Sequence, residues 1–145
     1  MSTRIADVYR TLGGKAILRK PIKNEADMAA VVAGGLPGKA LRALRAALNL
    51  TTKEFGKAVL IPERTLLAHQ KRGTLPAAES DRVYRLAQLT AAAGRALGDP
   101  EKAARWLRKP NRSLGGQRPL DAARTTIGAR LVEDALARIT HGTIG

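Results

Sequence analysis

The stretch TTKEFGKAVLIPERTLLAHQKRG, residues 51–73, decides the fold. Thr51 and Glu54 have the spacing of a capping box, in which each side chain satisfies a free backbone N–H at the start of a helix. A short helix is therefore predicted over residues 52–59. The side chains expected to face the core from this helix are Phe55 and Val59.

A second short helix is predicted directly after the tight turn VLIP. Pro62 suits the first turn of a helix, because a backbone N–H at that position would have no intrahelical partner. This helix runs to about Lys71 and stops at Gly73. Two short helices joined by a tight turn indicate a helix-turn-helix, whose second helix enters the major groove of DNA.

Helical periodicity gives this second helix a polar outer face. Small residues there permit close approach to DNA, and guanidinium groups bind guanine edges or phosphates. An amphipathic helix in any small bundle would also have a polar outer face, so that alternative stays open. The side predicted to face inward carries Glu63, Leu66, Leu67 and Gln70. The outer face carries Arg64, Thr65, Ala68 and Arg72, with His69 and Lys71 at its margins, and Lys53 on the preceding helix completes the predicted DNA-binding set.

Further helices are predicted on both sides of this motif. Upstream, leucines recur at helical spacing from Pro37 to Leu48, whereas the first 35 residues show only a short helix over about 25–33. No segment alternates as a strand does, so the predicted class is all-α. Downstream helices are predicted over residues 76–97, 100–108 with Asp99 as N-cap, 120–124 and 126–140. The last of them is expected to bury Ile127, Leu131, Leu136 and Ile139 on one face.

The composition favours an anionic partner. The 145 residues include 26 Lys and Arg against 12 Asp and Glu, a formal net charge of +14. Such a charge suits nucleic acid, an acidic protein or an anionic membrane face. Aromatic residues make up only 3%, which disfavours RNA binding by base stacking. Because no apolar stretch is long enough to span a membrane, a cytoplasmic protein without a membrane partner is expected.

The stretch SLGGQRPLD, residues 113–121, raises the question of a phosphate-binding loop. Such a loop needs a preceding strand and must open a helix, whereas this one follows a helix that stops at Pro110. The Gly-Gly pair is therefore interpreted as a sharp turn or positive-φ backbone, with Asn111 and Pro119 at its ends. With no cysteine and two isolated histidines, neither catalysis nor a cofactor or metal is expected.

These features together resemble the Xre/MbcA/ParS antitoxin family. The resemblance extends from about Gly35 to Gly142. Its most specific pieces are IPERTL, ESDR, GDPEKAARWL, PNRSLGGQRPLD and the final TTIGARLVEDALARITHG. Members of the family pair a Xre-like helix-turn-helix with a small helical toxin-binding domain. The resemblance thus implies an N-terminal arm over residues 1–35, a DNA-binding domain over 36–92 and a toxin-binding domain over 93–145.

The resemblance also implies a function and partners. The chain is expected to be the antitoxin of a type II toxin–antitoxin pair, with a RES-domain toxin that consumes NAD as its partner. It is expected to repress its own operon by binding operator DNA as a homodimer and to form a larger complex with the toxin. The residues implied in toxin binding are Trp106, Arg112, Leu114, Gly115, Gly116, Arg118, Arg130, Glu133, Arg138, His141, Ile144 and Gly145.

Several alternatives remain open from the residues alone. Trp106, the only tryptophan, serves either as core filler or as part of the platform that presents the Gly-Gly loop. The tail ITHGTIG either occludes the NAD pocket of the toxin or is a frayed terminus. The whole chain is alternatively a stand-alone transcriptional regulator with a dimerisation or ligand-sensing domain, or a nonspecific basic architectural protein.

Overall fold

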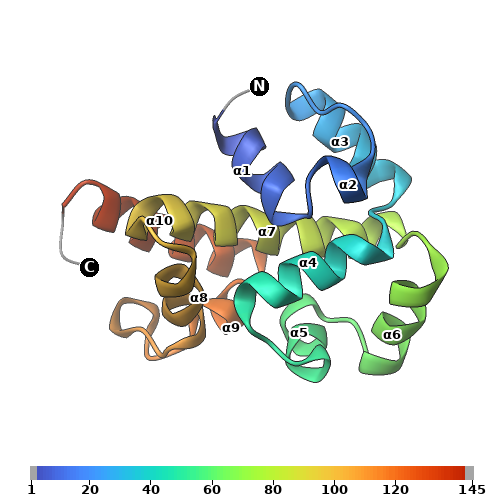
Figure 1. Cartoon of the computed structure of the whole chain (residues 1–145). Helices are drawn as coiled ribbons and strands as arrows, with labels where there is room; N and C mark the ends of the chain where they lie inside the picture. Colours follow the sequence, from blue (N-terminus) through green and yellow to red (C-terminus); the bar gives the residue numbers. More distant parts are fainter. Residues whose placement is uncertain (1–2, 143–145) are drawn as a thin grey trace.

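Helices and turns make up the part of the chain that the structure describes, residues 3–142 of a computed structural model (Figure 1). The predicted all-α class is confirmed. In chain order the elements are α1 (Thr3–Thr11), α2 (Lys15–Leu18), α3 (Glu25–Gly34), α4 (Gly38–Leu48), α5 (Thr52–Val59), α6 (Glu63–Arg72), α7 (Ala77–Leu97), α8 (Pro100–Arg108), the 3-10 helix η1 (Arg112–Leu114), α9 (Pro119–Ala122) and α10 (Thr126–Thr140).

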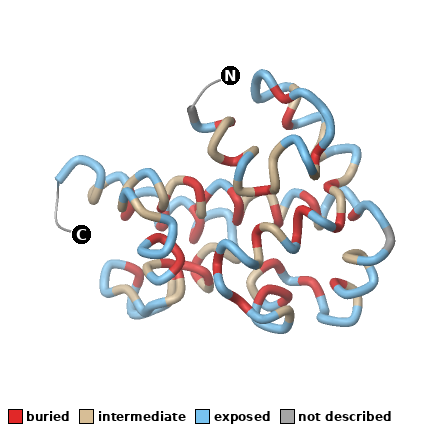
Figure 2. The backbone as a smooth tube through the Cα atoms, viewed as in Figure 1, coloured by how far each residue is buried: buried red, intermediate tan, exposed pale blue. Residues whose placement is uncertain are grey.

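The long helix α7 is the centre of the fold. It contacts α1, α3, α4, α5, α8 and α10, and Figure 1 shows it running across the middle of the molecule. One hydrophobic cluster takes in buried residues from α1 through α10, so the N-terminal and C-terminal helices share a single core (Figure 2). The predicted inward residues Val83, Leu86, Leu89 and Ala93 are buried, whereas Leu97 is only half-buried.

The first helices differ from the sequence prediction. Only a helix over 25–33 is expected in this segment, and the structure has that helix as α3 but adds α1 and α2 before it. α1 buries Ile5, Val8 and Leu12 and lies against α7. The carboxylate of Asp7 on α1 also pairs with Arg95 of α7 at 2.9 Å. The three buried residues have helical spacing, but Gly13 and Gly14 directly afterwards obscure the pattern.

Cap signals in the sequence place several helix ends correctly. Thr51 and Glu54 form both hydrogen bonds of the predicted capping box, and α5 spans the predicted residues 52–59. Asp99 accepts a hydrogen bond from the backbone N–H of Lys102, as an N-cap does. Side chains at helix starts therefore identify these ends without knowledge of the tertiary fold.

The orientation of α10 corrects the sequence prediction. Of the four residues expected to be buried, Leu136 is buried and Ile139 is half-buried, but Ile127 is 73% exposed and Leu131 50% exposed. The helix packs on α7 and α9 through a different face, which consists mostly of small side chains. Small residues let two helix backbones approach closely, and this packing outweighs the burial of two larger apolar residues. The residues buried along α10 are Gly128, Ala129, Val132, Ala135 and Leu136.

Candidate functional surfaces

The turn between α5 and α6 has a defined geometry. Leu60 takes a left-handed conformation with φ 58° and ψ 42°, which is uncommon for a residue with a branched side chain. The Nε of Arg82, from α7, donates a 2.8 Å hydrogen bond to the carbonyl of Val59. A side chain at Gly56 would place its Cβ 2.6 Å from the carbonyl oxygen of Ile61, so only glycine fits there. These contacts fix the angle between the two helices of the motif.

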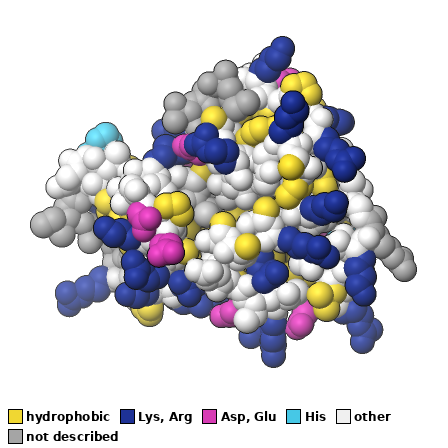
Figure 3. All heavy atoms as spheres, viewed as in Figure 1, with side chains coloured by type: hydrophobic (Ala, Val, Ile, Leu, Met, Phe, Trp, Pro, Cys, Tyr) yellow, Lys and Arg dark blue, Asp and Glu magenta, His cyan; other side chains and the backbone are white. Residues whose placement is uncertain are grey.

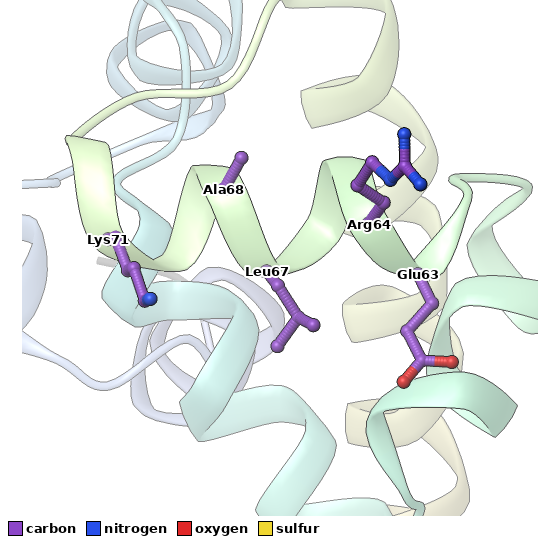
Figure 4. A pocket seen from close by; sticks show the side chains of 5 residues that line it. All are labelled: Glu63, Arg64, Leu67, Ala68 and Lys71. Carbon is purple, nitrogen blue, oxygen red and sulfur yellow. The ribbon is translucent and has the colours of Figure 1, made fainter.

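The exposed face of α6 forms a shallow groove of about 610 Å³. Figure 4 shows the lining side chains as two neighbouring rows, with Arg64 and Ala68 in one and Glu63, Leu67 and Lys71 in the other. The predictions that Arg64, Ala68 and Lys71 lie on this outer face are confirmed by their exposure.

Two residues of α6 that the sequence places inward are exposed instead. Leu66 is fully buried, as predicted, but the neighbouring Leu67 is 43% exposed. Glu63, also expected on the inward side, is exposed at the start of the helix. A helix with a single large anchor at Leu66 buries a narrower stripe than the periodicity indicates.

Two predicted outward residues are oriented differently. Thr65 is half-buried. The Nε2 of His69 lies 3.0 Å from Oε1 of Glu79, near the start of α7, and both atoms are buried. The imidazole therefore contacts α7 and does not extend from the outer face of α6. Lys53 is exposed on α5, while the side chain of Arg72 lies outside the described part of the structure.

The Gly-Gly segment is a compact turn, as the sequence predicts. The backbone N–H of Asn111 donates to the carbonyl of Gln117 at 2.9 Å, which closes the loop. Gly115 and Gly116 have φ values of 69° and 85°, in the left-handed region that favours glycine. Pro119 begins α9 at the other end. The predicted helix over 120–124 is thus shorter and starts one residue earlier.

A carboxylate with two arginines follows this turn. Asp121 accepts hydrogen bonds from Nε and Nη2 of Arg118 at 2.8 and 3.1 Å, and Nη2 of Arg124 lies 3.1 Å from the same carboxylate. The hydrogen bonds from Arg118 hold the pKa of Asp121 below its ordinary value. Arg118, which the sequence offers to an acidic partner, therefore already has an acidic partner within the chain.

The other residues implied in toxin binding are not all on the surface. Leu114 is buried in the core, and Trp106 is half-buried and packs against it. Arg138 is half-buried as well. Ile144 and Gly145 lie outside the described residues. The exposed ones are Arg112, Gly115, Gly116, Arg130, Glu133 and His141.

Sequence reasoning did not assign the exposed apolar residues of α10 to a site. Ile127 and Leu131 are one helical turn apart, and the exposed Arg130 lies beside them. The signal that identifies this face is the run of small residues on the opposite side of α10, which competes for the core.

Charge is distributed unevenly between cations and anions over the surface. Figure 3 shows Lys and Arg side chains spread across the visible face, with few Asp or Glu between them. Among the described residues, no helix is both long and apolar enough to cross a membrane.

Comparison with known proteins matches both parts of this architecture. Residues 27–88 match the model of the antitoxin Xre-like helix-turn-helix domain. Residues 92–142 match the model of the antitoxin Xre/MbcA/ParS C-terminal toxin-binding domain. The chain is also 39% identical over 84 residues to a protein of Pseudomonas putida named Antitoxin Xre. That alignment covers 57% of this chain and 53% of the relative, about half the length of each.

The two matched regions correspond to separate surfaces of one fold. The first contains the capped α5 and the groove along α6. The second contains the Gly-Gly turn, the Asp121 cluster and the exposed apolar residues of α10. The chain belongs to the Xre/MbcA/ParS antitoxin family.

Proposed function

We propose that the chain is the antitoxin of a type II toxin–antitoxin pair, a binding protein and not an enzyme. In this proposal its C-terminal region inhibits a RES-domain toxin that consumes NAD, and its helix-turn-helix represses their common operon. The family membership and the relative named Antitoxin Xre support it. Both partners would be met in the cytoplasm.

The exposed face of α10 carries the toxin-binding half of the proposal. Ile127 is 73% exposed and Leu131 50% exposed, within the region that matches a toxin-binding domain. The buried centre of a protein interface is apolar and depleted in charge, whereas its rim is polar. Ile127 and Leu131 suit the centre, and Arg130 and Glu133 suit the rim.

Two further toxin contacts are proposed from the family resemblance. The Gly-Gly turn exposes Arg112, Gly115 and Gly116 to a partner. The tail from His141 to Gly145 is proposed to occlude the NAD pocket of the toxin. Deleting residues 141–145 tests the tail: protection of cells that equals the full-length chain contradicts it.

The groove along α6 carries the DNA-binding half. Arg64 and Lys71 provide cations, and Ala68 leaves room for close approach to base edges. We propose that two copies bind a two-fold symmetric operator, because helix-turn-helix proteins commonly read paired half-sites. A larger assembly then forms when toxin joins this homodimer.

Co-expression with the neighbouring reading frame tests the proposal. The expected result is a stable complex in which the chain prevents toxin-dependent loss of cellular NAD. If the chain represses its promoter but binds no neighbouring product, it is a stand-alone regulator instead. Repression without a preferred operator at raised salt would indicate nonspecific binding, because salt weakens phosphate contacts.

A further inference from the structure

A second groove joins the helix-turn-helix to the C-terminal helices. It measures about 560 Å³ and lies along the turn between α5 and α6. Lys53 and Lys57 line it from α5, Leu60 from the turn and Glu63 from the start of α6. Arg124 also lines it, although it comes from the loop between α9 and α10. Figure 1 shows α5 and α9 on the same side of α7.

The position of this groove relative to DNA follows from how a helix-turn-helix docks. The first helix of the motif crosses the DNA backbone, and the N-terminal residues of the second helix reach the base edges. A groove bounded by α5 and by the start of α6 therefore faces the phosphates beside the major groove. The proposed function places DNA there, and this inference rests on that proposal.

The charges in the groove suit phosphate. Lys53, Lys57 and Arg124 provide three cations against the single carboxylate of Glu63. Lys53 and Lys57 are exposed on α5, one helical turn apart. Cations at such spacing neutralise neighbouring phosphates and release their counterions.

Arg124 is held in place and still has donor capacity. Its Nη2 lies 3.1 Å from Asp121, which the depressed pKa keeps ionised. Its Nε has no hydrogen-bond partner among the described residues. Since a guanidinium carries five N–H donors, the contact with Asp121 leaves others for an external acceptor. The side chain is 37% exposed, so such an acceptor can reach it.

We propose that Arg124 contacts the DNA backbone, so that a residue of the toxin-binding domain completes a phosphate site with Lys53 and Lys57. The helix-turn-helix alone then lacks part of its DNA contact. The competing interpretation is that Arg124 only orders the loop before α10 through Asp121.

The salt dependence of DNA binding by the full chain separates these interpretations. Arg124→Gln removes the charge but keeps a side chain able to donate to Asp121, while Arg124→Lys keeps the charge. Arg4→Gln is the matched control, because Arg4 is exposed on α1, on the other side of α7 from α5 (Figure 1). Fluorescence anisotropy measures affinity between about 50 and 200 mM KCl. The probes are a duplex from upstream of the gene and a random-sequence duplex of equal length.

The slope of log affinity against log salt becomes shallower by about 0.9 for each DNA phosphate that the protein no longer neutralises. We expect Arg124→Gln to show this change on both duplexes, and Arg124→Lys and Arg4→Gln to keep the original slope. A slope for Arg124→Gln equal to that of Arg4→Gln, with folding confirmed by circular dichroism, overturns the inference alone. If the unaltered chain binds neither duplex, the proposed DNA-binding function fails and the inference fails with it.

Discussion

The outer faces of α6 and α10 differ in both chemistry and packing. α6 exposes Arg64 and Lys71 around a small Ala68, whereas α10 exposes Ile127 and Leu131. Cations beside small residues suit a phosphate-lined groove, and large apolar residues suit the centre of a protein interface. One basic chain therefore presents two faces that favour different partners.

The two helices are also anchored in opposite ways. α6 is held by the fully buried Leu66, and its outer face is polar as expected of a surface helix. α10 is held by small residues such as Gly128 and Ala135, which leaves its larger residues outside. An apolar residue at helical spacing therefore need not belong to the core when smaller neighbours pack more closely.

The largest expected effect is on toxin binding through α10. Ile127→Asp combined with Leu131→Asp places two charges at the centre of the proposed interface. We expect toxin affinity to fall by about 4 kcal/mol, roughly a thousandfold. Calorimetric titration of the purified partners measures it. Leu67→Asp is the control, because Leu67 is a similarly exposed leucine on α6. Equal losses for the double variant and the control would contradict the assignment of the toxin to α10.

The next effect concerns the packing of α10. A Cβ at Gly128 would overlap the carbonyl oxygen of Ala122, so Gly128→Ala forces the helix away from α9. We expect a loss of about 3 kcal/mol in the free energy of unfolding, at the upper end for overpacking. Gly94→Ala on α7 is the control, because no atom lies within 4 Å of its added Cβ. Urea denaturation should show this control slightly stabilised, by up to about 1 kcal/mol.

DNA binding through α6 is expected to respond less. Arg64→Ala removes an exposed guanidinium from the outer face and should weaken operator binding by about 2 kcal/mol. Toxin affinity should be unchanged, because α10 carries that contact. Gel-shift titrations on the upstream duplex measure the effect. Normal repression by this variant would mean that another helix reads the operator.

The capping box of α5 is worth still less. The hydroxyl of Thr51 accepts from the backbone N–H of Glu54 at 3.1 Å, and the Glu54 carboxylate accepts from the N–H of Thr51 at 2.9 Å. Thr51→Ala removes the first bond and should cost about 1 kcal/mol of stability. Thr52→Ala, one residue inside the helix, is the control. Thermal unfolding that gives the two variants the same midpoint would contradict the role of this cap.

The smallest expected effect is the acid sensitivity of the Asp121 cluster. Because the folded-state pKa of Asp121 lies below its ordinary value of 3.8, the ionised form stabilises the fold above that pH. The contribution is lost as pH falls through the lowered pKa. Stability of the unaltered chain should therefore decrease more steeply below about pH 4 than that of Asp121→Asn. Parallel slopes in unfolding at several pH values would argue against this pair, whose arginines are partly screened by solvent.

The sequence predicted those features that depend on neighbours in the chain. The capping box at Thr51, the N-cap at Asp99 and the positive φ of Gly115 all follow from local backbone chemistry. The bounds of α10 are predicted for the same reason, since Thr125 caps it.

Features that depend on distant segments could not be predicted. His69 contacts Glu79 because α7 starts beside α6, and no spacing in the sequence encodes that approach. Arg124 reaches the groove beside α5 only after α9 has packed against α8 and α10. The outer face of α10 is likewise decided by its close packing on α7.

The most direct test of two faces for two partners is hydrogen–deuterium exchange of the full chain, free, with the upstream duplex and with toxin. We predict that DNA slows exchange in α5 and α6, whereas toxin slows it in α10 and in the Gly-Gly turn. Protection of the same helices by both partners would contradict the account.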